Sequence, residues 1–274
     1  GGDKQGIPIL TTVANSLSDT QVKRASVKES WDFIVSDLKN AESLLGKQTW
    51  TANADKHKVT GWGVKGFLGK VYVYTQDWNN AKTYLSDVIN NSGKSLVSFD
   101  VYKTMFNGQN EFNSESLFEL NLNVDMSYSG SSDLSMGSMI GTIIAPTYVS
   151  PTNGLPIASA WTNLFPHAKN LSRFGFNLGH YFKSGTTSAN VANVDPTYVT
   201  KSQQAKANKT VDPRLWVACL QPYVDSMVVS GVKRPIAHYL DITELDMEAW
   251  SFRKYINLAG TELEVNRANG NNIQ

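Results

Sequence analysis

The stretch 60–91, TGWGVKGFLGKVYVYTQDWNNAKTYLSDVINN, decides the fold. Thr60 is a predicted N-cap, and the apolar residues after it follow helical spacing to about Thr75. Asp77 is placed to cap a second helix that ends near Asn91. Two helices of this length with a short turn between them predict a helical hairpin. A lone hairpin cannot cover its own apolar face, so we expect other helices to pack on it.

Three glycines stand three residues apart inside the first helix of this hairpin, at positions 63, 66 and 69. Each lowers helix propensity by about 1 kcal/mol relative to Ala. We expect the close approach of a neighbouring helix backbone to compensate. The helix pair has about the length of one tetratricopeptide-type repeat, although no second repeat is recognisable in the sequence.

A further helix is predicted before the hairpin, over residues 27–45. Ser26 and Glu29 have the spacing of a capping box, in which each side chain accepts from an orphan backbone amide of the other residue. The apolar positions from Val27 to Leu45 follow steps of three and four, and Gly46 is placed to end the helix.

Composition excludes several classes of protein. The chain has 274 residues, a formal charge of +1, 41% hydrophobic and 11% aromatic residues, which disfavours disorder and general nucleic-acid binding. Its one cysteine, Cys219, allows neither an intrachain disulfide nor a cysteine-based zinc site. No apolar run approaches a membrane span, and the first residues lack a signal-peptide pattern, so we expect any export signal to lie outside this sequence.

The chain changes character after Gly93. Residues 115–122 alternate weakly and predict a short strand, 125–209 predict a long irregular region, and 252–256 predict another short strand. Residues 241–244 resemble a weak capping box, and 211–229 predict strand or turn structure. The predicted fold is mainly α, with tetratricopeptide-like helical hairpins as a scaffold, a large irregular loop region and a few short strands. We expect residues 1–124 to form the helical part and 125–274 the irregular part of a single domain.

The order of these motifs resembles the SusD/RagB family of surface nutrient-binding lipoproteins of the Bacteroidota. The resemblance rests on six elements in family order that cover most of the chain. They are Gly6-Ile7-Pro8-Ile9, the helix with Asp37-Leu38 and Ala41, Asp77-Trp78-Asn79-Asn80-Ala81, the pair Tyr102 to Phe106 and Glu115 to Leu120, Val211-Asp212-Pro213-Arg214-Leu215, and Phe252-Arg253-Lys254-Tyr255.

The resemblance implies that the protein binds an oligosaccharide or polysaccharide at the cell surface without cleaving it. A SusC-like TonB-dependent transporter in the outer membrane is the implied partner, to which the glycan is delivered. The family's lipid-bearing cysteine and its C-terminal helices are absent from this sequence, so it reads as an internal fragment whose contact with the membrane would depend on an anchor outside it.

Glycan capture needs flat apolar platforms with polar partners beside them, because the C–H faces of pyranose rings lie against aromatic rings. The irregular region carries the best candidates, and two tryptophans elsewhere come next. The predicted ligand-contacting residues are Trp161, Tyr148, Tyr128, Asn163, Asn153, Arg173, Trp50 and Trp250.

Other conspicuous residues are expected to be structural. Trp31, Trp62, Trp78 and Trp216 are predicted to pack in the core, and Cys219 is predicted to be an inert buried thiol. Arg214 is expected to make a structural, buried charge-assisted hydrogen bond. No cofactor, metal or catalytic signature is present, so we expect neither a cofactor nor enzymatic activity.

Three other functions stay open at this point. Peptide capture in the manner of RagB would require a cleft that satisfies backbone amides with fewer stacked rings. A glycosidase would need two carboxylates across the scissile bond, and no motif pairs them. A pure tetratricopeptide scaffold for partner helices would leave the long aromatic-bearing irregular segment unexplained.

Overall fold

The computed structural model describes residues 4–52, 55–106, 110–120, 143–158, 162–229, 231–239 and 250–254. The chain divides into two compact units. Unit 1 comprises the described residues of 1–97 and 112–119, and unit 2 comprises those of 98–111 and 120–273. The described part is mainly helical with a few short strands, which confirms the predicted fold class. None of its helices has both the length and the apolar composition to span a bilayer.

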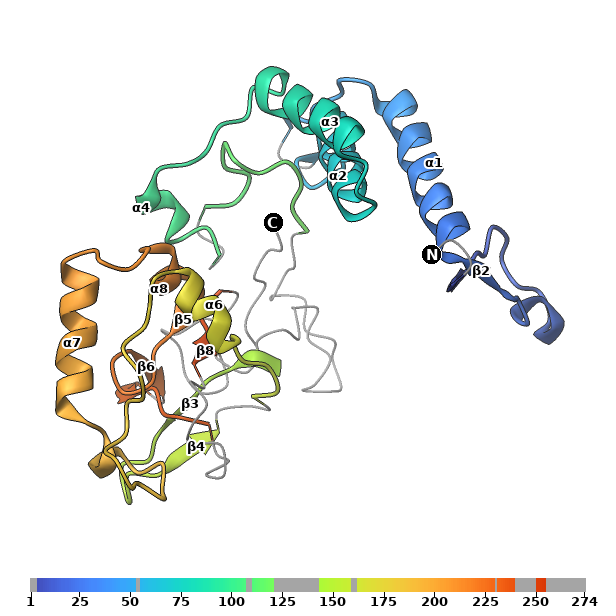
Figure 1. Cartoon of the computed structure of the whole chain (residues 1–274). Helices are drawn as coiled ribbons and strands as arrows, with labels where there is room; N and C mark the ends of the chain where they lie inside the picture. Colours follow the sequence, from blue (N-terminus) through green and yellow to red (C-terminus); the bar gives the residue numbers. More distant parts are fainter. Residues whose placement is uncertain are drawn as a thin grey trace. The chain divides into compact units, whose positions relative to one another are not determined.

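The helices of unit 1 form as predicted. They are α1 (Val27–Leu45), α2 (Gly61–Tyr74) and α3 (Trp78–Asn91), with N-caps Ser26, Thr60 and Asp77. The capping box of α1 is complete, since the Ser26 hydroxyl accepts from the Glu29 N–H at 3.1 Å and a Glu29 carboxylate oxygen accepts from the Ser26 N–H at 2.7 Å. Helices α2 and α3 lie side by side as the predicted hairpin (Figure 1).

The core of unit 1 lies between these three helices. Val64, Leu68 and Tyr72 of α2 and Ala81 of α3 are buried, and α1 packs Val35, Leu38 and Ala41 against them. A charged network crosses the same interface: Lys65 pairs with Asp87, and the Tyr84 hydroxyl donates to Glu42 at 3.2 Å. Burial and the Glu42 carboxylate raise the pKa of Tyr84 to about 12, so the hydroxyl keeps its proton and remains a donor.

The glycines of α2 meet different neighbours from those predicted. A Cβ at Gly63 would lie 3.2 Å from the Leu117 carbonyl oxygen, and one at Gly66 would lie 3.1 Å from a methyl group of Leu117. Only Gly69 approaches a helix, because its Cβ would lie 2.5 Å from Leu85 of α3. The expected approach of a helix backbone is therefore wrong for two of the three positions, which instead accommodate a loop.

That loop replaces the strand predicted over residues 115–122. The segment 115–119 forms no named strand, and its remaining predicted residues 121 and 122 lie outside the described ones. Its carboxylates satisfy loop amides: Glu115 accepts from the Val97 N–H at 3.1 Å, and Glu119 accepts from the Phe112 N–H at 2.6 Å. Side chains thus do what a strand ladder would otherwise do.

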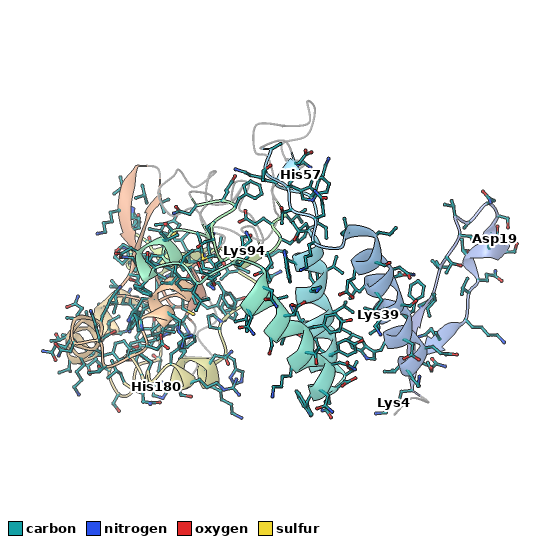
Figure 2. All side chains as sticks on the ribbon, turned by 90° about the horizontal axis from the view of Figure 1, so that it is seen from above. Lys4, Asp19, Lys39, His57, Lys94 and His180 are labelled. Atoms are coloured by element: carbon teal, nitrogen blue, oxygen red, sulfur yellow. The ribbon has the colours of Figure 1, made fainter. Side chains whose placement is uncertain are left out.

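Unit 1 also contains a two-stranded antiparallel sheet before α1. Strands β1 (Gln5–Pro8) and β2 (Arg24–Ser26) pair, and the connection between them contains the short 3₁₀ helix η1 (Leu17–Thr20). Figure 2 shows Asp19 at the outer end of this connection. Its carboxylate accepts from the backbone of Asn15 and Ser16, and these hydrogen bonds, with the Ser16 side chain, hold the pKa of Asp19 below its usual value.

Unit 2 is built from short strands and helices. Its helices are α4 (Phe99–Tyr102), α6 (Ala168–Arg173), α7 (Pro196–Ala207) and α8 (Arg214–Ala218), with the 3₁₀ turn η3 (Val191–Asn193). The antiparallel pairs are β3 (Thr147–Val149) with β4 (Pro156–Ala158), β5 (Cys219–Leu220) with β8 (Ser251–Phe252), and β6 (Ser226–Val229) with β7 (Val232–Pro235). Helices α6 and α7 contradict the prediction that 125–209 is irregular throughout. Residues 241–244 lie outside the described ones, so the predicted helical turn there stays a prediction.

Three of the family-like motifs converge in unit 2. Tyr102 and Phe106 pack edge to face, and Lys254 Nζ lies 3.8 Å from the Phe106 ring centroid while it donates to the Tyr102 hydroxyl at 3.2 Å. Arg214 makes the predicted charge-assisted bonds to Asp212, the shortest at 2.5 Å, and these bonds hold the pKa of Asp212 below its usual value. Arg214 is exposed and Asp212 is half-buried, so the bond is not the buried one that was predicted.

Candidate functional site

A strained residue, Thr162, lies at the start of the candidate surface in unit 2. Its φ is +49°, although it is β-branched, and such residues are genuine outliers at positive φ. Thr162 is nonetheless buried, and its hydroxyl donates to the Ala145 carbonyl at 2.9 Å. The next residue, Asn163, donates its backbone N–H to the Ile143 carbonyl at 2.7 Å. The loop is therefore held against the segment before β3 in a conformation that it would not adopt freely.

The three residues directly after Thr162 and one residue from a later segment form what we call the Asn163 rim: Asn163, Leu164, Phe165 and Tyr239. Asn163 and Leu164 are exposed, and Phe165 and Tyr239 are half-buried. The rings of Phe165 and Tyr239 meet edge to face, with centroids 4.6 Å apart and an interplanar angle of 61°. An edge-to-face pair of this kind is favourable beyond its area burial, so each ring fixes the other.

Strand β3 positions the Tyr239 side of the rim. The hydroxyl of Thr147 donates to the carbonyls of Ala237 and His238, at 2.8 and 3.0 Å, and the Ala237 N–H donates to the Thr147 carbonyl at 3.0 Å. The core beneath contains Ile144, Ala145, Tyr148, Leu220, Met227, Val229 and Ile236. Both halves of the rim are thus hydrogen-bonded to one stretch of chain, residues 143–147, which leads into β3.

The residue before Tyr239 is a buried neutral histidine. Burial lowers the pKa of His238 to about 4, and its Nδ1 forms a hydrogen bond with the Tyr181 hydroxyl. The Nε2 atom is buried and has no hydrogen-bond partner among the described residues. The imidazole therefore contributes shape and packing rather than charge at neutral pH.

The chemistry of the rim is that of binding. Two aromatic rings, an aliphatic side chain and an amide carry no charge, and none is a nucleophile or a carboxylate. Such a surface can stack on an apolar face and exchange hydrogen bonds with hydroxyl groups. Among the residues that the structure describes, no group of three or more His, Cys, Asp and Glu side chains is arranged to hold a metal ion.

Comparison with known proteins agrees with this fold. No family model matches the chain. A SusD-like protein from Bacteroides ovatus is 34% identical over 127 residues, which are 42% of this chain and 22% of that protein. A solved SusD-like carbohydrate-binding protein from Bacteroides fragilis superposes with a TM-score of 0.62 at 16% identity, over 98% of this chain and 47% of the other. By sequence over these 127 residues, and by fold, the chain is similar to SusD-like proteins.

The chain also superposes on a structure described as a laminarin-binding SusD-like protein, with a TM-score of 0.56 at 18% identity, over 97% of this chain and 51% of the other. At these identities the solved structures establish the fold alone. The chain spans 22% of the curated relative that it matches and about half of each of these two structures.

Of the eight predicted ligand residues, the structure places one on the rim. Asn163 is exposed there, whereas Trp161 and Tyr128 lie outside the described residues and stay predictions. Tyr148 and Trp250 are 8% and 0% exposed and belong to hydrophobic cores, so neither offers a ring face to a ligand. We correct the prediction at these two positions.

The other predicted residues make local hydrogen bonds of their own. Asn153 is exposed in the β3–β4 turn, where its side chain accepts from the Leu155 N–H at 3.1 Å. Arg173 ends α6 and donates to the Asn170 side chain at 3.1 Å. Trp50 is half-buried in unit 1, and its indole N–H donates to the Val59 carbonyl at 2.9 Å. Ligand contact at these three positions stays a prediction.

The sequence reasoning missed Phe165 and Tyr239. Both are aromatic residues in irregular segments, but their pairing depends on hydrogen bonds to residues 143–147 that no local pattern reveals. Among the tryptophans assigned to the core, Trp62 and Trp216 are buried as predicted, whereas Trp78 is 62% exposed and contradicts its assignment. Burial raises the pKa of the Cys219 thiol to about 12, which leaves it protonated at neutral pH, in agreement with its predicted inertness.

Proposed function

We propose that this protein captures a neutral glycan at the Asn163 rim and releases it unchanged. The observation that carries the proposal is the uncharged surface of Phe165, Tyr239 and Asn163 beside the strained, buried Thr162. Backbone strain persists only where the surroundings enforce it, and it concentrates at ligand-binding positions. Ring faces would stack on the sugar while the Asn163 amide pairs with its hydroxyl groups.

Two of the similar proteins support the choice of a glycan. One solved structure carries the description SusD-like carbohydrate-binding protein, and another is described as laminarin-binding. A β-glucan such as laminarin is therefore a reasonable first probe. Trp161 directly precedes Thr162 in the sequence, and we propose it as a further stacking residue.

We further propose that the glycan passes to a SusC-like TonB-dependent transporter in the outer membrane, from a protein held at the cell surface by a lipid. This part rests on the family resemblance. No catalytic step is included, because the rim contains no carboxylate, whereas most glycosidases use a pair of them.

Isothermal titration calorimetry of the protein against a glycan panel tests the proposal. The panel contains laminarin, soluble starch and galactomannan, and the variants are Asn163→Ala and, as a matched control, Asn40→Ala, an exposed amide on α1. We expect Asn163→Ala to weaken binding roughly tenfold, or about 1.4 kcal/mol, and Asn40→Ala to have no effect.

Two results would count against the proposal. Wild-type protein that ignores every glycan but binds short peptides would favour the RagB-like alternative. Release of reducing ends from any polysaccharide would show that the protein is an enzyme.

A further inference from the structure

The turn between α2 and α3 in unit 1 exposes large aromatic rings. Tyr74, the last residue of α2, is 66% exposed, and Trp78, the first residue of α3, is 62% exposed. The half-buried ring of Trp31, from α1, stacks on Tyr74 with a centroid distance of 6.4 Å and an interplanar angle of 13°. We call these three residues the hairpin platform.

The core of unit 1 does not need the two exposed rings. It closes with Val64, Leu68 and Tyr72 on α2 and with Ala81 on α3, against the apolar stripe of α1. Leaving a ring in water forgoes about 25 cal/mol for each Å² of apolar surface that could have been buried. Two such rings at one turn, with a third stacked on Tyr74, therefore offer apolar area that a ligand can cover.

The polar residues beside the rings indicate the class of ligand. Thr75, Gln76, Asn79 and Asn80 are all exposed, and they supply a hydroxyl and three amides. Between positions 71 and 81 the only charged residue is Asp77. Its carboxylate is already used at the N-terminus of α3, where it accepts from the backbone N–H and the side-chain amide of Asn80, at 3.2 and 2.6 Å.

We propose that the hairpin platform is a second sugar-stacking site, which takes glycan chains. Aromatic faces with amides and a hydroxyl beside them match the alternating C–H faces and hydroxyl groups of a pyranose chain. Lys70 and Lys82 lie one helical turn from Tyr74 and Trp78, so the test compares an acidic glycan with neutral ones. The inference rests on the proposed function, because it assumes that glycans are the ligands of this protein.

A second site would show itself with long chains more than with short ones. Binding a polymer at two places raises its apparent affinity without any new contact, whereas a short oligosaccharide occupies one site at a time. The hairpin platform should therefore contribute mainly to polysaccharide retention.

The test is affinity electrophoresis in gels that contain laminarin, soluble starch or galactomannan, with pectate as an acidic comparison. The variants are the double substitution Tyr74→Ala/Trp78→Ala, the single Trp78→Phe, which keeps a ring, and Ile89→Ala. Ile89 is a matched control, because it is an apolar residue of α3 that is 74% exposed. Circular dichroism verifies that each variant is folded.

We expect the double variant to lose roughly tenfold in apparent affinity for a neutral polysaccharide, with Trp78→Phe losing much less and Ile89→Ala unchanged. Retention of the double variant at the wild-type level overturns the inference, and so does an equal loss in Ile89→Ala. If the double variant instead loses association with a protein partner and keeps its polysaccharide, the platform is a protein interface and the inference is also wrong.

The two proposals fail in different ways. Loss of binding in Asn163→Ala with full retention in the double variant would leave the proposed function intact and refute the hairpin platform. Wild-type protein that migrates unretarded in every gel would refute both.

Discussion

Acidification should destabilise unit 2 through His238. The folded protein binds this proton poorly, because burial lowers the pKa of the imidazole from 6.5 to about 4. The unfolded chain takes up the proton near pH 6.5. Stability is therefore fully present above pH 6.5, falls as the pH drops between 6.5 and 4, and loses no more through this group below pH 4.

The size of the effect follows from the two pKa values. One pKa unit corresponds to about 1.4 kcal/mol, so the complete contribution of His238 is roughly 3 kcal/mol. Most of this stabilisation is lost in the upper part of the pH range, with about 2 kcal/mol lost by pH 5. Carboxylates such as Asp212, whose pKa is held down by Arg214, lose their contribution at lower pH, so the range from 6.5 to 5 isolates the histidine.

Equilibrium urea unfolding at a series of pH values measures this contribution. His238→Asn keeps an amide where Nδ1 meets the Tyr181 hydroxyl but cannot titrate, so its free energy of unfolding should change little between pH 6.5 and 5. His180→Asn is the control, since His180 is exposed (Figure 2), and it should follow the wild type. A wild-type unfolding free energy that stays constant from pH 7 to 5, or an equal loss in His238→Asn, would refute the reasoning.

Four further substitutions test local features, and one of them, Gly66→Ala, is the comparison for Gly61→Ala. Ser26→Ala removes the α1 cap and should lower the free energy of unfolding by about 1 kcal/mol in urea titrations. Gly61→Ala should lower the free energy of unfolding by about 1–3 kcal/mol, and with it the Tm, because its Cβ would lie 1.8 Å from the Gly46 carbonyl oxygen. The added Cβ of Gly66→Ala meets only a leucine methyl, so this substitution should change the Tm less. Thr147→Val removes the hydroxyl that donates to the carbonyls of Ala237 and His238. Thermal unfolding should show a free energy of unfolding lower by about 1–3 kcal/mol, and calorimetry should show weaker glycan binding.

The helices of unit 1 could be predicted because their signals are local. Ser26, Thr60 and Asp77 each accept from an amide within three residues, so the cap and its target lie in one short window of sequence. Helix α7 was missed for the opposite reason. Its buried face presents Tyr198, Ser202 and Ala205, and a face with so little apolar character gives no hydrophobic periodicity.

A different signal for α7 was present in the sequence. Asp195-Pro196 combines an N-cap with proline at the first helical position, and Asp195 accepts from the Thr197 N–H at 2.8 Å as that pattern implies. The inward face is then satisfied by a polar relay, since the Ser202 hydroxyl donates to the Gln221 side chain at 2.5 Å and Gln221 donates to the Tyr198 hydroxyl at 2.9 Å. Capping chemistry would have found the helix where periodicity could not.

The candidate site was harder to predict than the fold, because exposure is a long-range property. Tyr148 and Trp78 are both aromatic residues next to polar ones, yet one is 8% exposed and the other 62%. Tyr148 is covered by the bridge between β3 and Ile236, which lies 88 positions further along the chain. Neighbouring sequence does not encode such a contact.

The strain at Thr162 connects the fold to the proposed function. A left-handed conformation costs an L-residue roughly 1–2 kcal/mol, and the single hydrogen bond from its hydroxyl to Ala145 offsets about as much. Replacement by glycine would relieve the strain and lose that bond, so little stability would change. Compared with glycine, the threonine restricts the backbone and so fixes the direction of the chain at Asn163. This restriction favours binding, because a preorganised amide loses less conformational entropy when a ligand binds.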